Sequence, residues 1–467
     1  MELSLQHILA ATRGRVLAGT LDLPVTDVII DSRTARPGSL FVPLVGTRAD
    51  GHDYVVAARA AGAASFVKKG HAACEELTAA AVGPVLIEVD EPLAALGDLA
   101  AFWRRQFGMK VVAITGSNGK TSTKEMAASI IGQKFHTIKN PGNFNNLIGL
   151  PLSLFQLDAT VEVAVLELGM SEPGEIARLA EISDPDIGII TNVGPAHLEQ
   201  LKTLDRIAAA KGELFSCLGT DDLALVNSDD ARVAALARNT AASKSYYGMA
   251  QGRVHASDIR PSAGGTRFTL HIGEASAEVA LGVPGAQFVI NALAAAGIAD
   301  ALGIGIEDIS SGLTAFRGVS GRMQTLEAGG STFINDAYNA NPVSTKAALA
   351  ALAGCAAGRR TIAALGDMLE LGDSSAAFHA EIGAAAAGLH IDLVLVTGKF
   401  SGAVRDGALG AGMASDRLLV CSNIEALAEK LRGLMLQGDI ILLKGSRGMK
   451  MERILELMKL HPPSGGH

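Results

Sequence analysis

The sequence predicts an α/β protein with three domains: a small N-terminal α/β domain over residues 1–87, a central ATPase-like parallel-sheet domain over 88–323, and a C-terminal Rossmann-like domain over 324–467. Three observations lead to this fold class. The chain has 467 residues, more than one hydrophobic core usually holds. Hydrophobic residues make up 48% of it and aromatic residues only 4%, which is typical of helices packed on parallel sheets. Short apolar runs alternate with Ala-rich helical patterns.

Each domain has its own pattern of predicted elements. Residues 1–87 hold short apolar runs at 28–30, 40–45 and 64–67, separated by glycine-containing turns. The central part begins with a helix at 91–107. It continues with buried strands at 111–115, 161–168, 187–191 and 223–227, an antiparallel insertion at 253–281, and a helix in FVINALAAAGIADALG. The C-terminal part repeats a strand followed by a polar loop in STFIND, TIAALGD, DLVLVTG and DIILLKG.

Composition excludes several classes of function. The formal net charge is -8 and there is no basic run, which argues against a nucleic-acid partner. Cys74, Cys217, Cys355 and Cys421 lie far apart without zinc-ligand spacing, so we expect free thiols in a reducing compartment. The N-terminus does not resemble a signal peptide, and no stretch reaches the length of a membrane span. We therefore expect a cytoplasmic protein without stable membrane insertion, and a monomer.

The stretch AITGSNGKTSTK, residues 113–124, follows a predicted strand and precedes a predicted helix. It is similar to a phosphate-binding loop, but only two residues separate Gly116 from Gly119, where the usual pattern has four. Backbone N–H groups and the helix N-terminus can bind phosphates there. Lys120 would neutralise the outer phosphates, and the Thr121 hydroxyl would bind Mg²⁺. The predicted nucleotide loop comprises Gly116, Ser117, Asn118, Gly119, Lys120, Thr121 and Ser122; the alternative is a tight turn with a solvated lysine.

Three further candidates lie at strand ends or on a helix. Glu167 ends the strand VEVAVLEL, where a phosphate-loop enzyme needs a second metal contact, although acids at strand ends are common. His197, in TNVGPAHLE, follows the next strand; a single histidine is more often a capping or core residue, and Mg²⁺ prefers oxygen ligands. Lys211, in AAAKGELF, lies in a helical pattern and by itself indicates a surface lysine.

The chain resembles the ATP-dependent Mur ligases, which share this shortened loop. The resemblance rests on four motifs in the same order: TGSNGKTSTK, LELGMSEPGEI, TNVGPAHLE and AKGELF. DSRTARPGSLFVPLVGTRADGHDYVVAARAAGA resembles their N-terminal nucleotide-sugar domain. Within the family, the chain most resembles the member that adds D-alanyl-D-alanine to UDP-N-acetylmuramoyl-tripeptide. The motifs for this are NPGNFNNLIGLPLSL, GRMQ, NDAYNANP, LGDMLELGDSSAAFHAEIG and LLKGSRGMKMERI.

The resemblance implies roles for residues that match the family motifs. Lys120 and Thr121 match phosphate and Mg²⁺ contacts, Glu167 and His197 match metal ligands, and Lys211 matches a lysine that is carbamylated in related ligases. A carbamate would turn that cation into an oxygen ligand. Asn291 matches an adenine contact, Arg322 an arginine near the phosphates, and Asp336 and Asn339 nucleotide contacts. The muramyl-peptide region includes Asn143, Asn145 and Asn146, and the uridine region includes Asp31, Ser32, Arg33, Gly51 and His52.

The sequence departs from the family at one motif. The family stretch Gly-x-His-Asn-x-x-Asn is here Gly285-Ala-Gln-Phe-Val-Ile-Asn291, with Gln287 and Phe288 in place of the His-Asn pair. The departure concerns the detail of adenine recognition and leaves the implied reaction unchanged.

The implied reaction is ATP-dependent amide formation through an acyl phosphate, with ATP and Mg²⁺ as cofactors. At the end of the strand DIILL, Lys444 and Arg447 are candidates for binding the carboxylate of the acceptor dipeptide, or else belong to a solvated basic loop. The alternatives are a sister ligase that adds a single amino acid and, from another class, a nucleotide-switch protein. A switch protein needs neither the N-terminal module nor the third domain.

Overall fold

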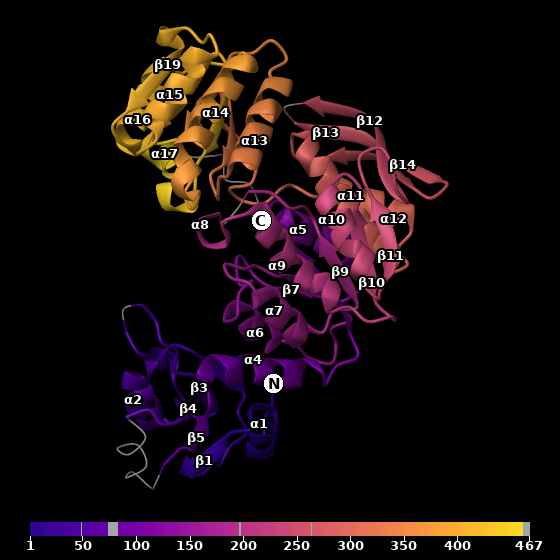
Figure 1. The fold of residues 1–467 in the computed structure, drawn as a ribbon, viewed down its shortest axis with the longest axis vertical. Coiled ribbons are helices and arrows are strands. Elements are labelled where there is room, and N and C mark those ends of the chain that lie inside the picture. Colours follow the sequence, from indigo (N-terminus) through magenta and orange to yellow (C-terminus); the bar gives the residue numbers. More distant parts are fainter. Residues whose placement is uncertain (48, 73–82, 196–197, 263, 461–467) are drawn as a thin grey trace. The chain divides into compact units, whose positions relative to one another are not determined.

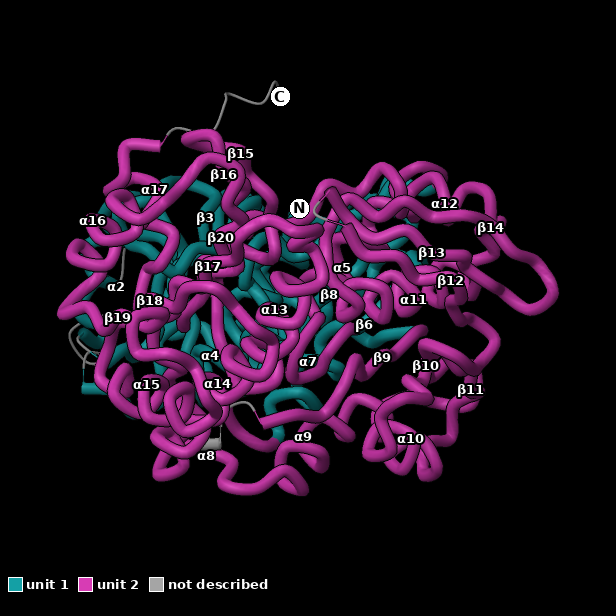
Figure 2. The backbone as a smooth tube through the Cα atoms, turned by 90° about the horizontal axis from the view of Figure 1, so that it is seen from above, with its two compact units in different colours: residues 1–113, 135–170, 174–186 teal, residues 114–134, 171–173, 187–467 magenta. Residues whose placement is uncertain are grey.

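In the computed structural model, residues 1–47, 49–72, 83–195, 198–262 and 264–460 are described, and their elements form three sheets (Figure 1). This confirms the predicted α/β class. The chain divides into two compact units (Figure 2): unit 1 comprises residues 1–113, 135–170 and 174–186, and unit 2 comprises 114–134, 171–173 and 187–467. The predicted three-domain limits stay a prediction.

The first sheet belongs to unit 1 and has five strands. Their order is β1 (Arg15–Ala18), β5 (Leu86–Val89), β4 (Ala64–Lys68), β3 (Ser39–Phe41) and β2 (Asp27–Ile29). The strands β2 to β5 pair in parallel, and β1 pairs antiparallel with β5. Helices α1 (Leu5–Thr12) and α2 (Val55–Ala60) belong to the same part of the chain. The sequence indicated β2, β3 and β4, whereas β1 and β5 were not identified.

The second sheet has nine strands. Their order is β14 (Ala275–Leu281), β13 (Gly265–Ile272), β12 (Val254–Ser262), β11 (Ser243–Tyr247), β10 (Leu223–Asn227), β9 (Ile187–Ile190), β6 (Lys110–Thr115), β8 (Val163–Glu167) and β7 (Thr137–Lys139). The boundary between the two units falls within β6. Strands β9, β10 and β11 pair in parallel, whereas β12, β13 and β14 form an antiparallel meander, which confirms the predicted insertion.

Helices precede, connect and follow the strands of the second sheet along the chain. Unit 1 contributes α4 (Pro92–Arg104), α6 (Gly149–Leu154) and α7 (Glu175–Ser183). Unit 2 contributes α5 (Lys120–Ile131), α8 (Leu198–Leu201), α9 (Leu204–Ser216), α10 (Ala231–Leu236), α11 (Ala286–Ala301) and α12 (Ile306–Ala315). Local sequence fixes several starts. The Thr203 side chain accepts a hydrogen bond from the Arg206 N–H at the start of α9, and Asp230 accepts from Arg232 and Val233 at the start of α10.

The third sheet lies within unit 2 and has six strands. Their order is β15 (Gln324–Ala328), β16 (Ser331–Asp336), β20 (Ile440–Lys444), β17 (Thr361–Leu365), β18 (Leu393–Thr397) and β19 (Leu418–Cys421). All neighbours pair in parallel except β15, an antiparallel edge strand. The helices here are α13 (Pro342–Gly354), α14 (Ser375–Gly388), α15 (Ser401–Gly410), α16 (Ile424–Leu434) and α17 (Arg453–Leu457). The doubly wound pattern predicted from residue 324 onward is confirmed.

Two further expectations concern the chain as a whole. Among the described residues, no helix has the length and apolar character needed to cross a membrane. Cys355 and Cys421 are buried free thiols and Cys217 is exposed, while Cys74 lies outside the described residues.

Helices α14 and α15 touch backbone to backbone through two glycines. A Cβ added at Gly383 would lie 1.9 Å from the Val404 carbonyl oxygen, and one at Gly407 would lie 1.9 Å from the Ala380 carbonyl oxygen. Because backbone atoms oppose both positions, no side-chain rotation can relieve the overlap. These glycines set how closely the two helices pack.

We expect Gly383→Ala to lower the free energy of unfolding by about 3 kcal/mol, because the methyl group forces the helices apart. The control is Gly402→Ala on α15, where an added Cβ meets nothing within 4 Å and should be neutral or slightly stabilising. Chemical denaturation of both variants and the wild type checks this. Equal stability of the two variants would contradict the packing described.

Candidate active site

The loop of residues 116–119 joins β6 to α5 and is fixed by the segment that follows β9. The Ser117 N–H donates to the Asn192 carbonyl oxygen at 3.0 Å, and the Ser117 hydroxyl lies 2.9 Å from both the N and the O of Gly194. The Asn118 N–H donates to Asn192 Oδ1 at 3.0 Å. The Asn118 carbonyl oxygen accepts from Thr191 Oγ1 at 2.6 Å and from Asn192 Nδ2 at 3.0 Å. Both backbone polar groups of Asn118 are therefore occupied.

Two glycines allow this loop to approach its neighbours. Gly116 has φ +147°, and a Cβ there would lie 1.9 Å from Thr191 Oγ1. Gly119 has φ +84° at the start of α5, and a Cβ there would lie 2.2 Å from Asn291 Oδ1. Asn291, predicted as an adenine contact, therefore lies directly against the loop. Phe288, which replaces the family's asparagine, is buried on α11 and contributes to the core.

Lys120 and Lys211 bring two amines to the loop. Lys120 begins α5, and its Nζ donates to the Gly116 carbonyl oxygen at 2.7 Å. Lys211 lies on α9 with only 2% of its surface exposed, so the surface-lysine alternative is wrong. Within the described part of the chain, the side chain of Lys211 forms no hydrogen bond or ion pair. Burial, and to a lesser extent the charge of Lys120, hold the pKa of Lys211 well below its usual range.

Thr121 and Ser122 follow Lys120 in the first turn of α5, and both are buried. The segment after β9 is itself held by the β10–α10 connection. Asn227 Nδ2 donates to the Thr191 carbonyl oxygen at 2.7 Å, and the Val193 N–H donates to Asp230 Oδ2 at 2.7 Å. Asp230 thus caps α10 and also holds the segment that follows β9. His197 lies outside the described residues.

Glu167 ends β8 in unit 1 and is buried there. Asn145 Nδ2 donates to Glu167 Oε1 at 2.7 Å, and Asn140 bonds both backbone groups of Glu167. Asn145 and Glu167, predicted for substrate and metal respectively, are therefore direct partners. Asn146 Oδ1 accepts from the N–H groups of Ile148 and Gly149 at the start of α6. Asn143 is exposed.

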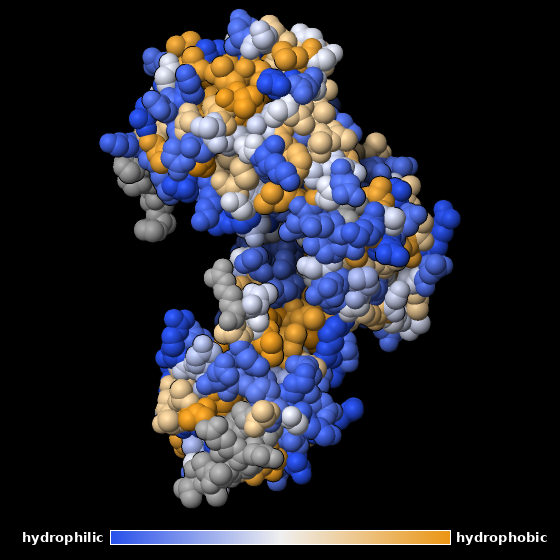
Figure 3. Space-filling model, turned by 60° about the vertical axis from the view of Figure 1, so that its left-hand side comes forward, coloured by the Kyte–Doolittle hydropathy of each residue, from blue (hydrophilic) through white to orange (hydrophobic). Residues whose placement is uncertain are grey.

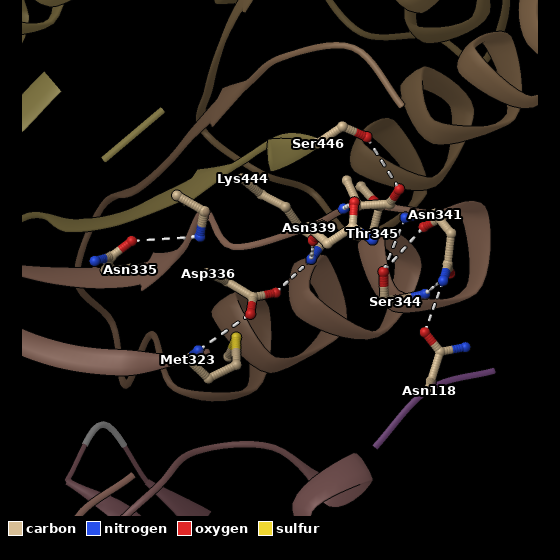
Figure 4. A network of polar contacts seen from close by, with 12 residues as sticks. Asn118, Met323, Asn335, Asp336, Asn339, Asn341, Ser344, Thr345, Lys444 and Ser446 are labelled. Atoms are coloured by element: carbon tan, nitrogen blue, oxygen red, sulfur yellow. Dashed lines mark hydrogen bonds and ion pairs between the residues drawn. The ribbon is translucent and has the colours of Figure 1, made fainter. Parts of the chain in front are cut away.

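Asp336 and Lys444 form an ion pair in the third sheet (Figure 4). They face each other in the register of β16 and β20, and Lys444 Nζ lies 2.5 Å from Asp336 Oδ2. The other Asp336 oxygen accepts from the Met323 N–H at 3.1 Å, and Lys444 also donates to the Asn339 carbonyl oxygen at 3.0 Å. Lys444 is buried, so its charge is matched within the protein. The Asn339 side chain accepts from the Ala340 N–H.

Arg322 and Arg447 both lie over the ring of Tyr338. Their guanidinium carbons are 4.2 and 5.7 Å from its centroid, and Arg447 also pairs with Glu452 at 2.8 Å. The ring stabilises two nearby cations through its quadrupole. The two arginines were predicted from the sequence, whereas Tyr338 was not, although it lies in the NDAYNANP motif. Thr191 and Asn192 were missed likewise; the signal for them was their position directly after β9.

Of the residues predicted for uridine, two form a surface pair and one is buried. Asp31 accepts from Arg33 at 2.6 to 3.1 Å, and these hydrogen bonds lower the pKa of Asp31 to about 2. His52 is buried, with Nδ1 2.6 Å from Asp50 Oδ1 and Nε2 accepting from the Lys68 N–H at 3.1 Å. Both ring nitrogens are thus engaged in holding the turn, even though Asp50, His52 and His71 bring potential metal ligands within 4.8 Å of one another. Ser32 and Gly51 lie in the same two turns.

Family models match most of the chain. The Mur ligase family catalytic domain matches residues 24–104, the Mur ligase middle domain matches 114–299, and the Mur ligase glutamate ligase domain matches 321–447.

Individual relatives match over nearly their whole length. The UDP-N-acetylmuramoyl-tripeptide–D-alanyl-D-alanine ligase of Bacillus subtilis is 34% identical, over 94% of this chain and 96% of that protein. The enzyme of the same name from Escherichia coli is 35% identical, over 94% of each. Among solved structures, MurF from Acinetobacter baumannii gives a TM-score of 0.88 at 31% identity, over 98% of this chain and 99% of that one. MurF from Thermotoga maritima in complex with ADP gives 0.82 at 28% identity, over 93% and 97%.

We expect Gly116→Ala to weaken binding of ADP by a hundredfold or more, on the order of 3 kcal/mol, because its Cβ would collide with Thr191 in a strained backbone conformation. Calorimetric titration with ADP measures the loss. Thermal unfolding of the same sample shows whether the loop alone is affected. Wild-type affinity in Gly116→Ala would contradict the loop geometry.

Proposed function

Since the chain belongs to the Mur ligase family, we propose that it joins D-alanyl-D-alanine to UDP-N-acetylmuramoyl-tripeptide at the expense of ATP. The product is the UDP-muramyl-pentapeptide precursor of peptidoglycan, and ADP and phosphate are released. The relatives that carry this name match over nine-tenths of the chain. The observation that carries the proposal in the structure is the loop of residues 116–119, which is locked in place with Lys120 and the buried Lys211 beside it.

The reaction has two steps. A carboxylate oxygen of the tripeptide attacks the γ-phosphorus of ATP, and the bond from that phosphorus to the bridging oxygen of ADP breaks. This gives an acyl phosphate. The amine of D-alanyl-D-alanine then attacks the acyl carbon, loses a proton, and phosphate leaves. The carboxylate and the triphosphate repel each other, so the first step needs positive charge at the γ-phosphate.

The chain's own residues supply binding and orientation. Lys120 places an amine at the loop, and the N–H groups at the start of α5 offer donors to the phosphates. The hydrogen bonds from Thr191 and Asn192 keep the loop from rearranging as the charge shifts, so no reorganisation is needed during the reaction. Asn291, against Gly119, is proposed to contact the adenine side of the nucleotide. Arg322 is proposed to face the phosphates while it stacks on Tyr338.

The donor set suits Mg²⁺. Thr121 offers a hydroxyl and Glu167 a buried carboxylate, which are the oxygen ligands that this hard cation prefers. His197 is proposed as a further ligand. When bound, the ion would neutralise charge on the phosphates.

Lys211 is proposed to act as a carbamate. A buried ammonium group without a counter-charge is costly, and the amine reacts with carbon dioxide only when it is neutral. Burial favours this neutral form. The resulting carbamate would carry a negative charge that offsets Lys120 and offers oxygen atoms to the metal.

Substrate recognition is assigned by region. Asp31, Ser32, Arg33, Gly51 and His52 are proposed to form the uridine region, with His52 acting through the turn it holds. Asn143, Asn145 and Asn146 are proposed for the muramyl-peptide, and Asp336 and Asn339 for the nucleotide. Lys444 is buried in its pair with Asp336, whereas Arg447 is exposed in its pair with Glu452, so Arg447 is the stronger candidate for binding the acceptor carboxylate.

We also propose that the protein is a cytoplasmic monomer. Its substrates are soluble small molecules. Among the described residues, the exposed large apolar side chains are scattered along the chain, from Val16 to Leu436. On the face seen in Figure 3, hydrophilic side chains interrupt the apolar surface.

The proposed function is tested by incubating the purified protein with UDP-N-acetylmuramoyl-tripeptide, ATP and Mg²⁺, together with either D-alanyl-D-alanine or D-alanine. We expect the pentapeptide product by mass spectrometry and a strong preference for the dipeptide. ATP turnover should stay low until both co-substrates are present. Efficient addition of single D-alanine would favour a sister ligase, and turnover without either co-substrate would favour a nucleotide switch.

We expect Lys211→Ala to lose most ligase activity, roughly a hundredfold or more, because it removes the proposed carbamate. Added formate or acetate should restore part of the activity by placing a carboxylate in the vacated space. A second readout is the carbamate signal in ¹³C NMR after equilibration with ¹³C-bicarbonate, present in the wild type and absent in the variant. A wild-type spectrum without this signal would contradict the carbamate.

A further inference from the structure

Asn341 is the N-cap residue of α13, and this role fixes the orientation of its side-chain amide. Asn341 Oδ1 accepts from the Ser344 N–H at 2.9 Å, and Ser344 Oγ accepts from the Asn341 N–H at 3.1 Å. This reciprocal capping box occupies the amide oxygen. The amide nitrogen therefore points away from the helix as a preset donor.

The amide nitrogen of Asn341 donates to the phosphate loop, the loop of residues 116–119. Asn341 Nδ2 lies 2.7 Å from Asn118 Oδ1, across 223 positions of the sequence and within unit 2 (Figure 4). Both backbone groups of Asn118 are already bonded to Thr191 and Asn192. The backbone that carries this side chain is therefore fixed, and Asn118 Oδ1 can accept the hydrogen bond from Asn341 without a rearrangement of the loop.

The hydrogen bond between Asn341 and Asn118 links the third sheet to the second. Asn341 follows β16 by five residues, next to the Asp336–Lys444 pair of the third sheet, whereas Asn118 belongs to the loop of the second sheet. Ser446, after β20, donates to the Ala340 carbonyl oxygen at 3.3 Å and so supports the same turn. Val343, in the first turn of the helix, lies close to Gly194, which itself bonds Ser117.

We propose that Asn341 is a positioning residue that holds the phosphate loop against the region of residues 324–467, so that nucleotide binding and the placing of that region are coupled. Asn118 is the receiving group in the loop. Asn341 acts through Asn118 and need not touch the nucleotide. The coupling to ligation rests on the proposed function, whereas the coupling to nucleotide binding does not.

The test uses Asn341→Ser. Serine caps a helix about as well as asparagine, but its hydroxyl is too short to reach Asn118. We expect the affinity for ADP, measured by calorimetry, to fall roughly fivefold, the loss of one neutral hydrogen bond, and kcat for ligation to fall by a similar factor. The matched control is Asn423→Ser, the same change at the N-cap of α16, where the asparagine accepts from Ala426 N–H and makes no contact with the loop. It should bind ADP like the wild type.

A double-mutant cycle with Asn118→Ala separates positioning from capping. If the bond carries the effect, Asn341→Ser should cause no further loss of ADP affinity in the Asn118→Ala background. Independent, multiplying effects would overturn the proposal, as would an Asn341→Ser variant with wild-type affinity. If Asn341→Ser lowers the thermal stability equally in the wild-type and Asn118→Ala backgrounds, capping explains the loss and the proposal fails. A wild type that binds ADP but does not ligate would contradict the proposed function alone.

Discussion

The phosphate loop depends on one constraint: its backbone is tied to the segment that follows the neighbouring strand. Thr191 and Asn192 bond both polar groups of Asn118, and Gly116 approaches Thr191 so closely that only a glycine fits. In an open parallel sheet, ligands bind at the carboxyl ends of the strands, where such loops gather. Because Thr191 and Asn192 hold the backbone of the loop, the short loop can place Lys120 and the start of α5 at the carboxyl end of the sheet. It does not need the longer turn of the usual motif.

The charges of three lysines are the second feature that shapes the site. Lys120 supplies positive charge at the loop, whereas the side chain of Lys211 is buried with no partner among the described residues, which favours its neutral form. A protein tolerates this arrangement when a bound anion or a chemical change compensates it. A triphosphate at the loop and a carbamate at Lys211 would both do so. By contrast, Lys444 is compensated within the protein by Asp336, which gives this lysine a structural part in the third sheet.

The sequence predicted the strands best where apolar residues ran without interruption, as in β6, β10 and β20. Short strands such as β1, β5 and β7 have too few residues to show a clear period. The loop residues were predicted from glycine spacing and strand position. The partners of Glu167 and Asp336 were not predicted, because pairing depends on register: Asp336 and Lys444 were assigned to different ligands, although β16 and β20 place them opposite each other. Motif letters could not show that His52 and Lys211 are buried.

The central claim is that the locked loop positions ATP for attack by a carboxylate, and transfer of an oxygen atom tests it most directly. The terminal carboxylate of the UDP-linked tripeptide is labelled with ¹⁸O, and ligation is run to completion with ATP and D-alanyl-D-alanine. The account predicts that each phosphate released carries one ¹⁸O, because the carboxylate oxygen that attacks phosphorus leaves with it, while the other stays in the new amide. Phosphate without ¹⁸O, formed together with the pentapeptide, would contradict the account.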